Sequence, residues 1–285
     1  RTHHHPHPVQ LQIRSIMVTA RETEGLADAA IRSTETRLFN GGGCAVEWAW
    51  ERVDEMRVPQ TPRSYYERGH LGHAMIEAYL TGDDAADWPH DVLECYVPPE
   101  GDWLETTKCT KAGLFDEVSN VYDRWLEQFL NLEEYEDYDQ VNCEVMLECM
   151  TPNGTSVSTE ADAIFWWFDS PAVVDWKLGT SKSGKAMQLY VYWYVMRKSG
   201  YIDKSAPFRA WFHYPTYAKP IVHITDYPGD TFVEAYIDQA EKVRRNGPYL
   251  PNPEWFNCSQ CQMKDKCPLW GGDWEETRKI EVVFV

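Results

Sequence analysis

The sequence lacks any run of about 18 apolar residues, which is the length that a membrane-spanning helix requires, so we expect no membrane partner. It also lacks a basic segment followed by a long apolar stretch in its first residues, which argues against a secretory signal. Eight cysteines are present, but a disulfide framework is improbable in a chain of this size without an export signal. We therefore expect a cytoplasmic location.

The chain has ample material for a large core. It has 285 residues, 43% of them hydrophobic and 14% aromatic, with 13 Trp and 16 Tyr. That composition excludes a disordered chain, and the length suits one or two domains. We expect residues 1–20, which include the cluster His3, His4, His5 and His7, to form a disordered tail, and residues 21–285 to form one domain.

Positive charge is scarce overall but concentrated in one place. The formal net charge is −18, which argues against non-specific coating of DNA, because proteins that wrap a duplex are usually basic. Acidic residues gather in 82–105 and 133–139. Residues 176–198 contain no acid but five bases, namely Lys177, Lys182, Lys185, Arg197 and Lys198. This segment could form a local basic channel within an acidic protein.

The hydrophobic periodicity predicts an α/β core with a helical N-terminal part. Helices are expected at 21–39, 44–56, 65–80, 114–132, 185–197 and 231–245. Strands are expected at 142–150, 156–168, 172–177, 208–214 and 221–225, with a turn at 152–154 between the first two. The acidic segment 82–105 is expected to be a loop or an insertion.

Two acids in predicted strands, Asp162 and Asp175, lie thirteen residues apart and could meet across a short strand–turn–strand. Adjacent carboxylates repel one another unless a cation bridges them, and Mg²⁺ or Mn²⁺ suits oxygen ligands. Lys177 lies two residues after Asp175, on the same face of the strand, where its ammonium could orient an attacking water. The alternative is an ordinary strand end, because D-x-K often occurs by chance.

Three further residues extend this pattern. Gln188 and Tyr192 are spaced i and i+4, so they share one face of the helix that follows the strand. They could reach a backbone phosphate, or they could be one polar residue and one core tyrosine. His73 lies within a predicted helix and could be a core histidine or a third metal ligand, which suits Mn²⁺ better than Mg²⁺.

In this order, Gly69-x-x-x-His73, Asp162, Asp175-x-Lys177 and Gln188-x-x-x-Tyr192 resemble the RecB-like branch of the PD-(D/E)XK nucleases. The resemblance implies a restriction-endonuclease-like core, in which helices flank a central mixed β-sheet. It also implies that His73, Asp162, Asp175 and the Trp176 carbonyl hold the metal and that Lys177 is catalytic. It assigns contacts with DNA to Gln188 and Tyr192. Glu144 resembles the less constant upstream acid of the family, and Glu148 competes for that role.

Three cysteines, Cys258, Cys261 and Cys267, form a C-x2-C-x5-C pattern that is typical of a metal or cluster site, and Cys44 is the best fourth ligand. A distant N-terminal cysteine combined with a C-terminal trio resembles the iron–sulphur subset of these nucleases, the CRISPR-associated (Cas-four type) and AddB-type exonucleases. The resemblance implies a 4Fe-4S cluster that joins residues 21–60 to 250–270, around the helical part and catalytic core in 61–249. Zn²⁺ is the alternative. The other four cysteines, Cys95, Cys109, Cys143 and Cys149, are expected to be small buried hydrophobes.

The resulting hypothesis is a metal-dependent DNA exonuclease that acts on single strands or ends, in replication, recombination, repair or CRISPR adaptation. The basic segment, including Lys182 and Lys185, would follow the phosphates. No P-loop of the type GxxxxGK[ST] is present, so a helicase, recombinase or adaptation complex is an expected partner, beside homo-oligomerisation. Two alternatives remain open. One is a DNA-binding or recombination accessory module that does not cut and has a structural zinc or iron–sulphur site, and the other is a zinc-stabilised interaction protein.

Overall fold

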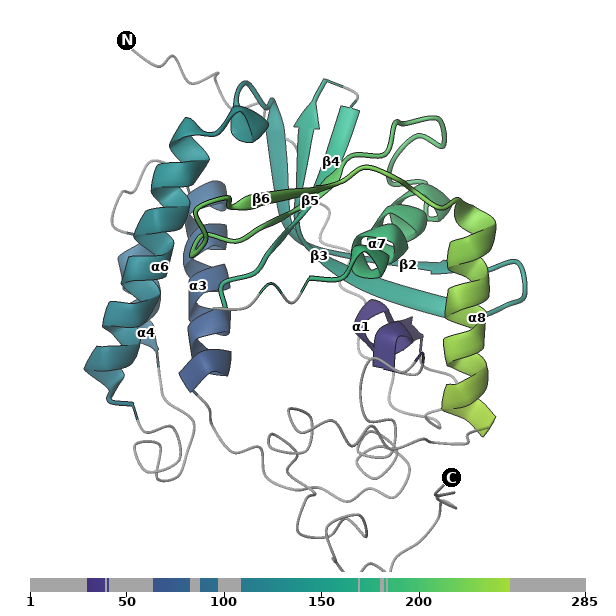
Figure 1. Cartoon of the computed structure of the whole chain (residues 1–285), viewed down its shortest axis with the longest axis horizontal. Helices are drawn as coiled ribbons and strands as arrows, with labels where there is room; N and C mark the ends of the chain where they lie inside the picture. Colours follow the sequence, from purple (N-terminus) through teal and green to yellow (C-terminus); the bar gives the residue numbers. More distant parts are fainter. Residues whose placement is uncertain are drawn as a thin grey trace, which may run out of the picture.

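The computed structural model describes residues 30–38, 40, 64–82, 88–96, 109–168, 170–179, 182 and 184–246. They form a mixed, curled β-sheet with helices on both faces (Figure 1). The strands are β1 Ile31–Arg32, β2 Gln140–Met150, β3 Ser156–Trp167, β4 Ser170–Trp176, β5 Ala210–His213 and β6 Ile221–Ile224. The helices are α1 Ser33–Arg37, α3 Ser64–Thr81, α4 Trp88–Cys95, α6 Lys111–Asn131, α7 Ala186–Lys198 and α8 Asp230–Asn246, with the 3-10 helix η2 at Glu133–Tyr135. Within these ranges, every helix is too short or too polar to span a bilayer.

Strand β3 is the centre of the sheet. Strand β2 pairs with it in antiparallel orientation along one edge. The other edge is shared, because β1 pairs in parallel at Val157 and Ser158 whereas β4 pairs in antiparallel orientation from Ala163 to Trp167. Strand β5 then runs parallel to β4, and β6 is antiparallel to β5. The shared edge leaves a short gap in β3 between its two partners, and Asp162 lies in this gap.

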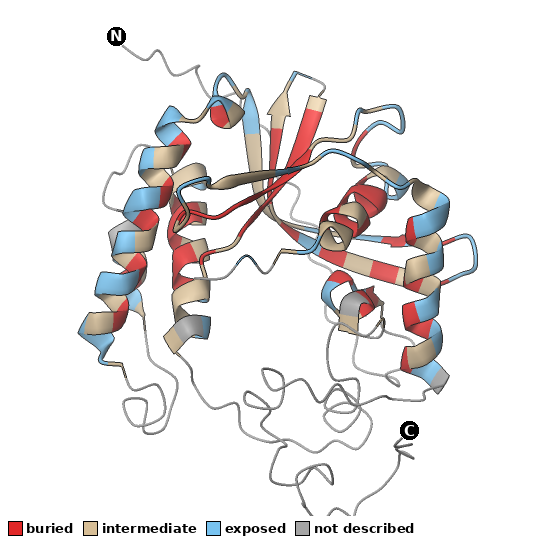
Figure 2. Cartoon of the chain, in the orientation of Figure 1, coloured by how far each residue is buried: buried red, intermediate tan, exposed pale blue. Residues whose placement is uncertain are grey.

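Among the described residues, two core clusters lie on opposite faces of the sheet. Because side chains alternate along a strand, Phe165 and Val174 pack toward α3 and α6, whereas Ile164 and Val173 pack toward α7. Helix α6 contributes a buried stripe at helical spacing: Leu114, Val118, Tyr122, Trp125 and Phe129. Figure 2 shows the buried residues along the inner sides of the helices and on the strands.

Most of the predicted elements are confirmed with small changes at their ends, including α3, α6, α7, α8 and strands β2 to β6. One prediction is wrong. Residues 31–32 are not helical but form β1, because the β-branched, fully buried Ile31 pairs with Val157 of β3. For the acidic segment 82–105, predicted as a loop or an insertion, the structure contradicts a simple loop, because the segment contains α4, whose Leu93 is buried against the α3–α6 cluster. The helix predicted at 44–56 lies outside the described residues.

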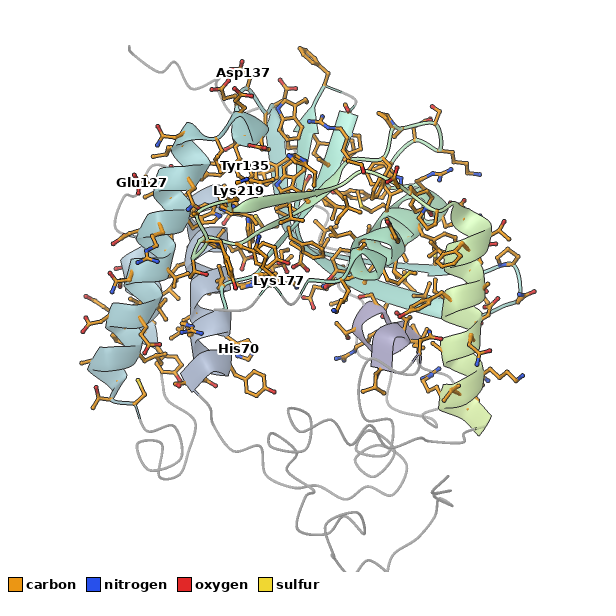
Figure 3. All side chains as sticks on the ribbon, viewed as in Figure 1. His70, Glu127, Tyr135, Asp137, Lys177 and Lys219 are labelled. Carbon is orange, nitrogen blue, oxygen red and sulfur yellow. The ribbon has the colours of Figure 1, made fainter. Side chains whose placement is uncertain are left out.

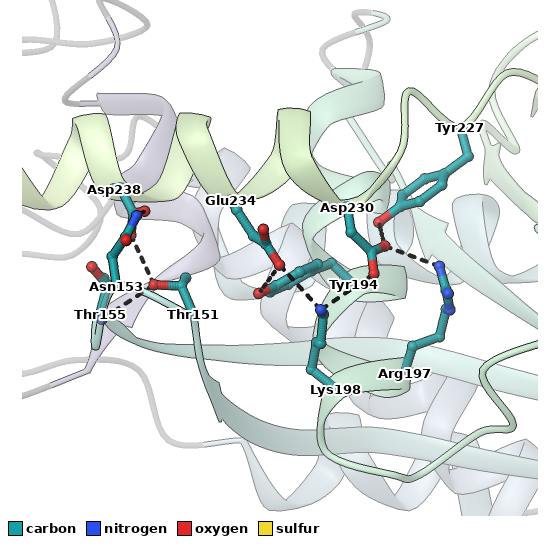
Figure 4. Close-up of polar contacts among 10 residues, drawn as sticks. All are labelled: Thr151, Asn153, Thr155, Tyr194, Arg197, Lys198, Tyr227, Asp230, Glu234 and Asp238. Carbon is teal, nitrogen blue, oxygen red and sulfur yellow. Dashed lines mark hydrogen bonds and ion pairs between the residues drawn. The ribbon is translucent and has the colours of Figure 1, made fainter.

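Helix α8 is attached to its neighbours by polar contacts (Figure 4). The ammonium of Lys198 on α7 lies 3.1 Å from a carboxylate oxygen of Glu234 and 3.4 Å from one of Asp230. Farther along α8, Asp238 accepts a hydrogen bond of 2.9 Å from the Thr151 hydroxyl in the β2–β3 turn. These contacts fix α7 against the sheet from its outer side.

The two-cluster core gives a prediction about stability. Phe165 is fully buried and lies against the rings of Phe129, Tyr135 and Tyr138, so Phe165→Ala should lower the free energy of unfolding by about 3–5 kcal/mol. Phe232→Ala on α8, where the ring is 53% exposed, should change it by no more than about 0.5 kcal/mol. Urea unfolding followed by circular dichroism measures both, and equal losses would contradict the assigned core.

Candidate active site

The predicted site residues meet where the middle of β2 and β3 and the end of β4 approach two helices. His73 comes from α3, on one side of the sheet, and α7 approaches from the other. Glu144 comes from β2, Asp162 from β3, and Asp175 and Trp176 from β4. Lys177 directly follows β4, and Gln188 and Tyr192 come from α7. The structure therefore brings together residues that are up to 119 positions apart in the sequence, from 73 to 192.

Glu144 interrupts the regular alternation of β2. Its φ of 48° lies in the left-handed region, which is uncommon for a residue other than glycine and is a form of backbone strain. Its neighbours Cys143 and Val145 pack in opposite core clusters, although residues two apart on a strand normally share a face. The residues flanking Asp162 on β3 do the same, and the register places Asp162 opposite Glu144. This reversal of the pleat places the two carboxyl groups side by side.

His73, Glu144 and Asp162 form a cluster that could hold a metal ion. One ligand atom from each side chain lies within 4.8 Å of the others. The Nε2 of His73 lies 3.1 Å from the Trp176 carbonyl, which can only accept, so this nitrogen carries the proton. The Nδ1 of the neutral ring is then an acceptor, and it lies 3.6 Å from Oδ1 of Asp162, which is another acceptor. A cation between these two atoms resolves the conflict.

Ionisation at the cluster is costly in the absence of a cation. Burial raises the pKa of Glu144 to about 7, and repulsion from Asp162 adds to the effect. Burial likewise raises the pKa of Asp175 to about 7, again with repulsion from Asp162. The pKa of Asp162 rises to about 6 through burial, opposed by Lys177 and by the Trp176 amide, which donates a hydrogen bond of 2.7 Å to Oδ2. Burial lowers the pKa of His73, so a protonated imidazole is not the balancing charge.

Asp175 and Lys177 form a second group beside the metal cluster. The Lys177 ammonium pairs with Oδ2 of Asp175, and the Gln188 amide donates a hydrogen bond of 2.6 Å to Oδ1. The Gln188 side-chain oxygen lies 3.3 Å from the ammonium and accepts from it. The lysine is therefore held between a carboxylate and an amide, and only about a fifth of its side chain is exposed.

Tyr192 lies behind Gln188 rather than at the surface. Its side chain is 3% exposed, and its hydroxyl accepts a hydrogen bond of 2.7 Å from the Gln188 amide. This burial suits a role in positioning Gln188 better than the direct contact with DNA that the sequence suggested. Gln188 itself is only partly buried.

Lys182 and Lys185, the two further lysines predicted to contact DNA, have different surroundings. Lys182 lies over two aromatic rings, 5.0 Å from the centroid of Tyr217 and 5.7 Å from that of Tyr214. Lys185 is the N-cap residue of α7. Figure 3 shows Lys177 at the end of β4, close to the start of the basic segment 176–198.

The structure also places Glu148 and two of the predicted buried cysteines. Glu148, near the end of β2, accepts a hydrogen bond from the hydroxyl of Ser156. The metal cluster therefore contains Glu144 and not Glu148. Cys149 is buried as expected, whereas Cys95 is exposed, which contradicts its prediction as a buried hydrophobe. The proposed cluster ligands Cys44, Cys258, Cys261 and Cys267 lie outside the described residues.

A pocket of about 500 Å³ adjoins the metal cluster and was not predicted from the sequence. Helix α3 supplies all of its lining except one residue from β2, and the full set is Tyr66, Gly69, His70, His73, Ala74, Glu77 and Glu144. The α3 residues recur at the i, i+3, i+4 and i+7 spacing of one helix face, which is the signal that could have revealed them.

A family model described as the PD-(D/E)XK nuclease superfamily matches residues 33–268, which include every residue of the cluster. The chain belongs to the PD-(D/E)XK nuclease superfamily. Nucleases of this superfamily use divalent metals, and the donor set of one imidazole and two carboxylates fits such an ion.

The solved structures that are similar to the chain include the following two. A protein designated SSO0001 has 14% identity and a TM-score of 0.38, over 87% of this chain and 89% of that one. A protein from Eubacterium rectale, described as a candidate exonuclease, has 13% identity and a TM-score of 0.48, over 88% of this chain and 91% of that one. A comparison with curated proteins found no significant match.

The raised pKa of Glu144 predicts how an uncharged substitute behaves. With metal removed by EDTA, Glu144→Gln should raise the melting temperature at pH 8 by a few degrees, because the wild-type carboxylate is ionised there at a cost. This advantage should shrink toward pH 5, where the wild-type group is protonated in the folded protein, since its folded pKa lies above its usual value. Differential scanning calorimetry across pH 5–8 measures the difference.

Saturating Mn²⁺ should reverse the order at pH 8, because the ion stabilises only a protein that can bind it. A Glu144→Gln advantage that is constant with pH, or that survives Mn²⁺ unchanged, would contradict the assignment of Glu144 to the cluster.

Proposed function

We propose that this nuclease-superfamily chain is a metal-dependent DNA exonuclease of the RecB-like branch, which hydrolyses phosphodiester bonds in single strands or at DNA ends. The observation that supports it most is the pair of acceptors, Nδ1 of His73 and Oδ1 of Asp162, 3.6 Å apart beside Glu144. Such an arrangement is unfavourable by itself and favourable around a cation.

The metal ligands in this proposal come from four elements. His73, through Nδ1, would hold Mg²⁺ or Mn²⁺ together with Asp162 and Glu144, with the carboxylate of Asp175 as a further ligand. The Trp176 carbonyl takes part by accepting the hydrogen bond from Nε2 that orients the His73 ring. The imidazole ligand favours Mn²⁺. When bound, the ion would polarise a phosphoryl oxygen and lower the pKa of a water molecule.

Lys177 would act on the attacking water and on the charge that develops at the phosphate. Its ammonium is already oriented by Asp175 and by the oxygen of Gln188, so no reorganisation is needed when substrate binds. Tyr192 would keep the Gln188 amide in place. Asp175 thus serves both groups, since it balances the lysine on one side and lies next to the metal ligands on the other.

The basic segment 176–198 would attract the phosphates of DNA to the site, although the protein as a whole is acidic. Lys182 and Lys185 follow Lys177 closely along the chain, and the segment 176–198 contains no acid. A local positive potential at the site can attract a polyanion although the net charge is −18. We expect binding to weaken with added salt for the same reason.

A structural metal cluster outside the described residues forms a separate part of the proposal. Cys44 and the trio Cys258, Cys261 and Cys267 would hold a 4Fe-4S cluster, with Zn²⁺ as the alternative, and would make residues 21–285 one domain. The support is the cysteine spacing and the resemblance to the iron–sulphur subset.

The biological setting that we propose is DNA processing. The enzyme would act in DNA replication, recombination, repair or CRISPR adaptation, in the cytoplasm, with a helicase, recombinase or adaptation complex as partner. A DNA-binding module that does not cut is the second candidate. The lysine held between Asp175 and Gln188 favours the enzyme, because a module that only binds has no need of an oriented ammonium.

Removal of Asp175 should abolish cleavage. End-labelled single- and double-stranded DNA incubated with Mn²⁺ or Mg²⁺ should be cut by the wild-type protein, and Asp175→Ala should reduce the rate at least about 100-fold. Asp203→Asn, which changes an exposed acid in the loop after α7, is the matched control and should cut normally. No metal-dependent cleavage, or equal cleavage by Asp175→Ala, would reject the proposal.

The cysteine cluster has a visible signature. A 4Fe-4S protein purified without oxygen is brown, with broad visible absorption, whereas the zinc form is colourless. Cys258→Ala should remove the colour and the iron, and Cys95→Ala, at an exposed cysteine, should not. A colourless wild-type protein that contains zinc would replace the iron–sulphur proposal with its alternative.

A further inference from the structure

The α3 pocket continues away from the metal cluster along one helix face. His73 and Glu144 belong both to the cluster and to the pocket lining, so the two sites are continuous. The acidic end carries Glu77 and Glu144, whereas the opposite end, toward the start of α3, carries Tyr66 and His70. Figure 3 shows His70 in the N-terminal half of α3. One end therefore suits a cation, and the other suits an aromatic group and an anion.

Gly69 keeps the middle of this pocket open. Glycine within a helix is less favourable than alanine, so its presence inside an 18-residue helix calls for a reason. Close packing is not that reason, because a Cβ added at Gly69 would have no atom within 4 Å among the described residues. Gly72, one turn along, is different, since a Cβ there would lie 2.4 Å from the side chain of Leu178. Among the described residues, the space over Gly69 is therefore open to a ligand.

Tyr66 is well placed to meet a base. Its side chain is 52% exposed, and it lies seven residues before His73, which corresponds to about 10 Å along the helix axis. That distance suits the base of a nucleotide whose neighbouring phosphate lies at the metal cluster. Aromatic side chains stack on bases of any sequence, but only when the face of the base is not covered by its own stack.

We propose that this pocket binds one nucleotide next to the scissile phosphate, with its unpaired base stacked on Tyr66. Its sugar passes over Gly69, and the imidazole of His70 donates a hydrogen bond to its phosphate. The inference rests on the proposed nuclease function and adds to it a subsite that selects an unpaired nucleotide. The enzyme requires an unpaired nucleotide at this position, so it prefers single strands and frayed ends to blunt duplexes.

Kinetics of Tyr66 variants test the stacking contact. Tyr66→Ala should weaken binding of a single-stranded oligonucleotide, measured by fluorescence anisotropy in Ca²⁺, about 5- to 100-fold, and should raise KM for cleavage in Mn²⁺ with a smaller effect on kcat. Tyr66→Phe should retain most of the affinity, because the ring remains. Phe232→Ala, which removes an equally exposed ring from α8, is the matched control and should bind as the wild type does.

Gly69→Leu separates stability from binding. Leucine is a good helix former and meets no described neighbour, so the melting temperature should stay the same or rise by about 2–4 °C, while the affinity for single strands falls at least tenfold. A variant with normal melting temperature and normal affinity would overturn the pocket as a nucleotide site.

Substrates with a single abasic residue locate the subsite. One position next to the cut should be sensitive to loss of its base in the wild type and insensitive in Tyr66→Ala, since the stacking partner is gone. If wild-type protein cuts DNA but no abasic position matters, or if Tyr66→Ala keeps the same sensitivity, the subsite is wrong and the nuclease stands. If wild-type protein does not cut, the proposed function fails first.

Discussion

The buried repulsion among Glu144, Asp162 and Asp175 is the constraint on which the rest of the site depends. Three carboxyl groups lie in one place with a neutral His73, and burial raises the pKa of each acid. A folded protein normally avoids such a cluster because it costs stability near neutral pH. Lys177 offsets one of these charges through its ion pair with Asp175, and a bound cation would offset the remainder at Glu144 and Asp162, which is the physical basis for a metal-dependent activity.

The surrounding fold holds this unfavourable arrangement in position. The left-handed backbone at Glu144, and the stretch of β3 between its pairings with β1 and β4, release two acids from the regular sheet. The amide of Trp176 holds Asp162, and the carbonyl of the same residue sets the His73 tautomer. On the other side, α7 supplies Gln188, and polar contacts from α8 fix α7 in turn. Strain and repulsion are thus local, whereas the two core clusters that offset them lie on both faces of the sheet.

Much of the fold and part of the site could be predicted from the sequence. Asp175 and Lys177 are two residues apart on one strand, and Gln188 and Tyr192 are one helical turn apart, so their grouping follows from local geometry. Glu144 could not be separated from Glu148 on periodicity, because the choice depends on a positive φ that no pattern encodes. Strand β1 and helix α4 were missed for a related reason. Ile31 and Leu93 take their structure from distant partners, and tertiary contacts override local propensity there.

Binding experiments directly test whether Asp162 and its neighbours bind a divalent ion. Isothermal titration of the metal-free protein with Mn²⁺ at pH 6.5, in buffers of different ionisation enthalpy, measures both the affinity and the protons released. Because the pKa values of the acids are raised to about 6 or 7, binding should release protons, and it should be lost in Asp162→Asn but kept in Asp203→Asn. Equal binding by the two variants, or binding without proton release, would contradict the account.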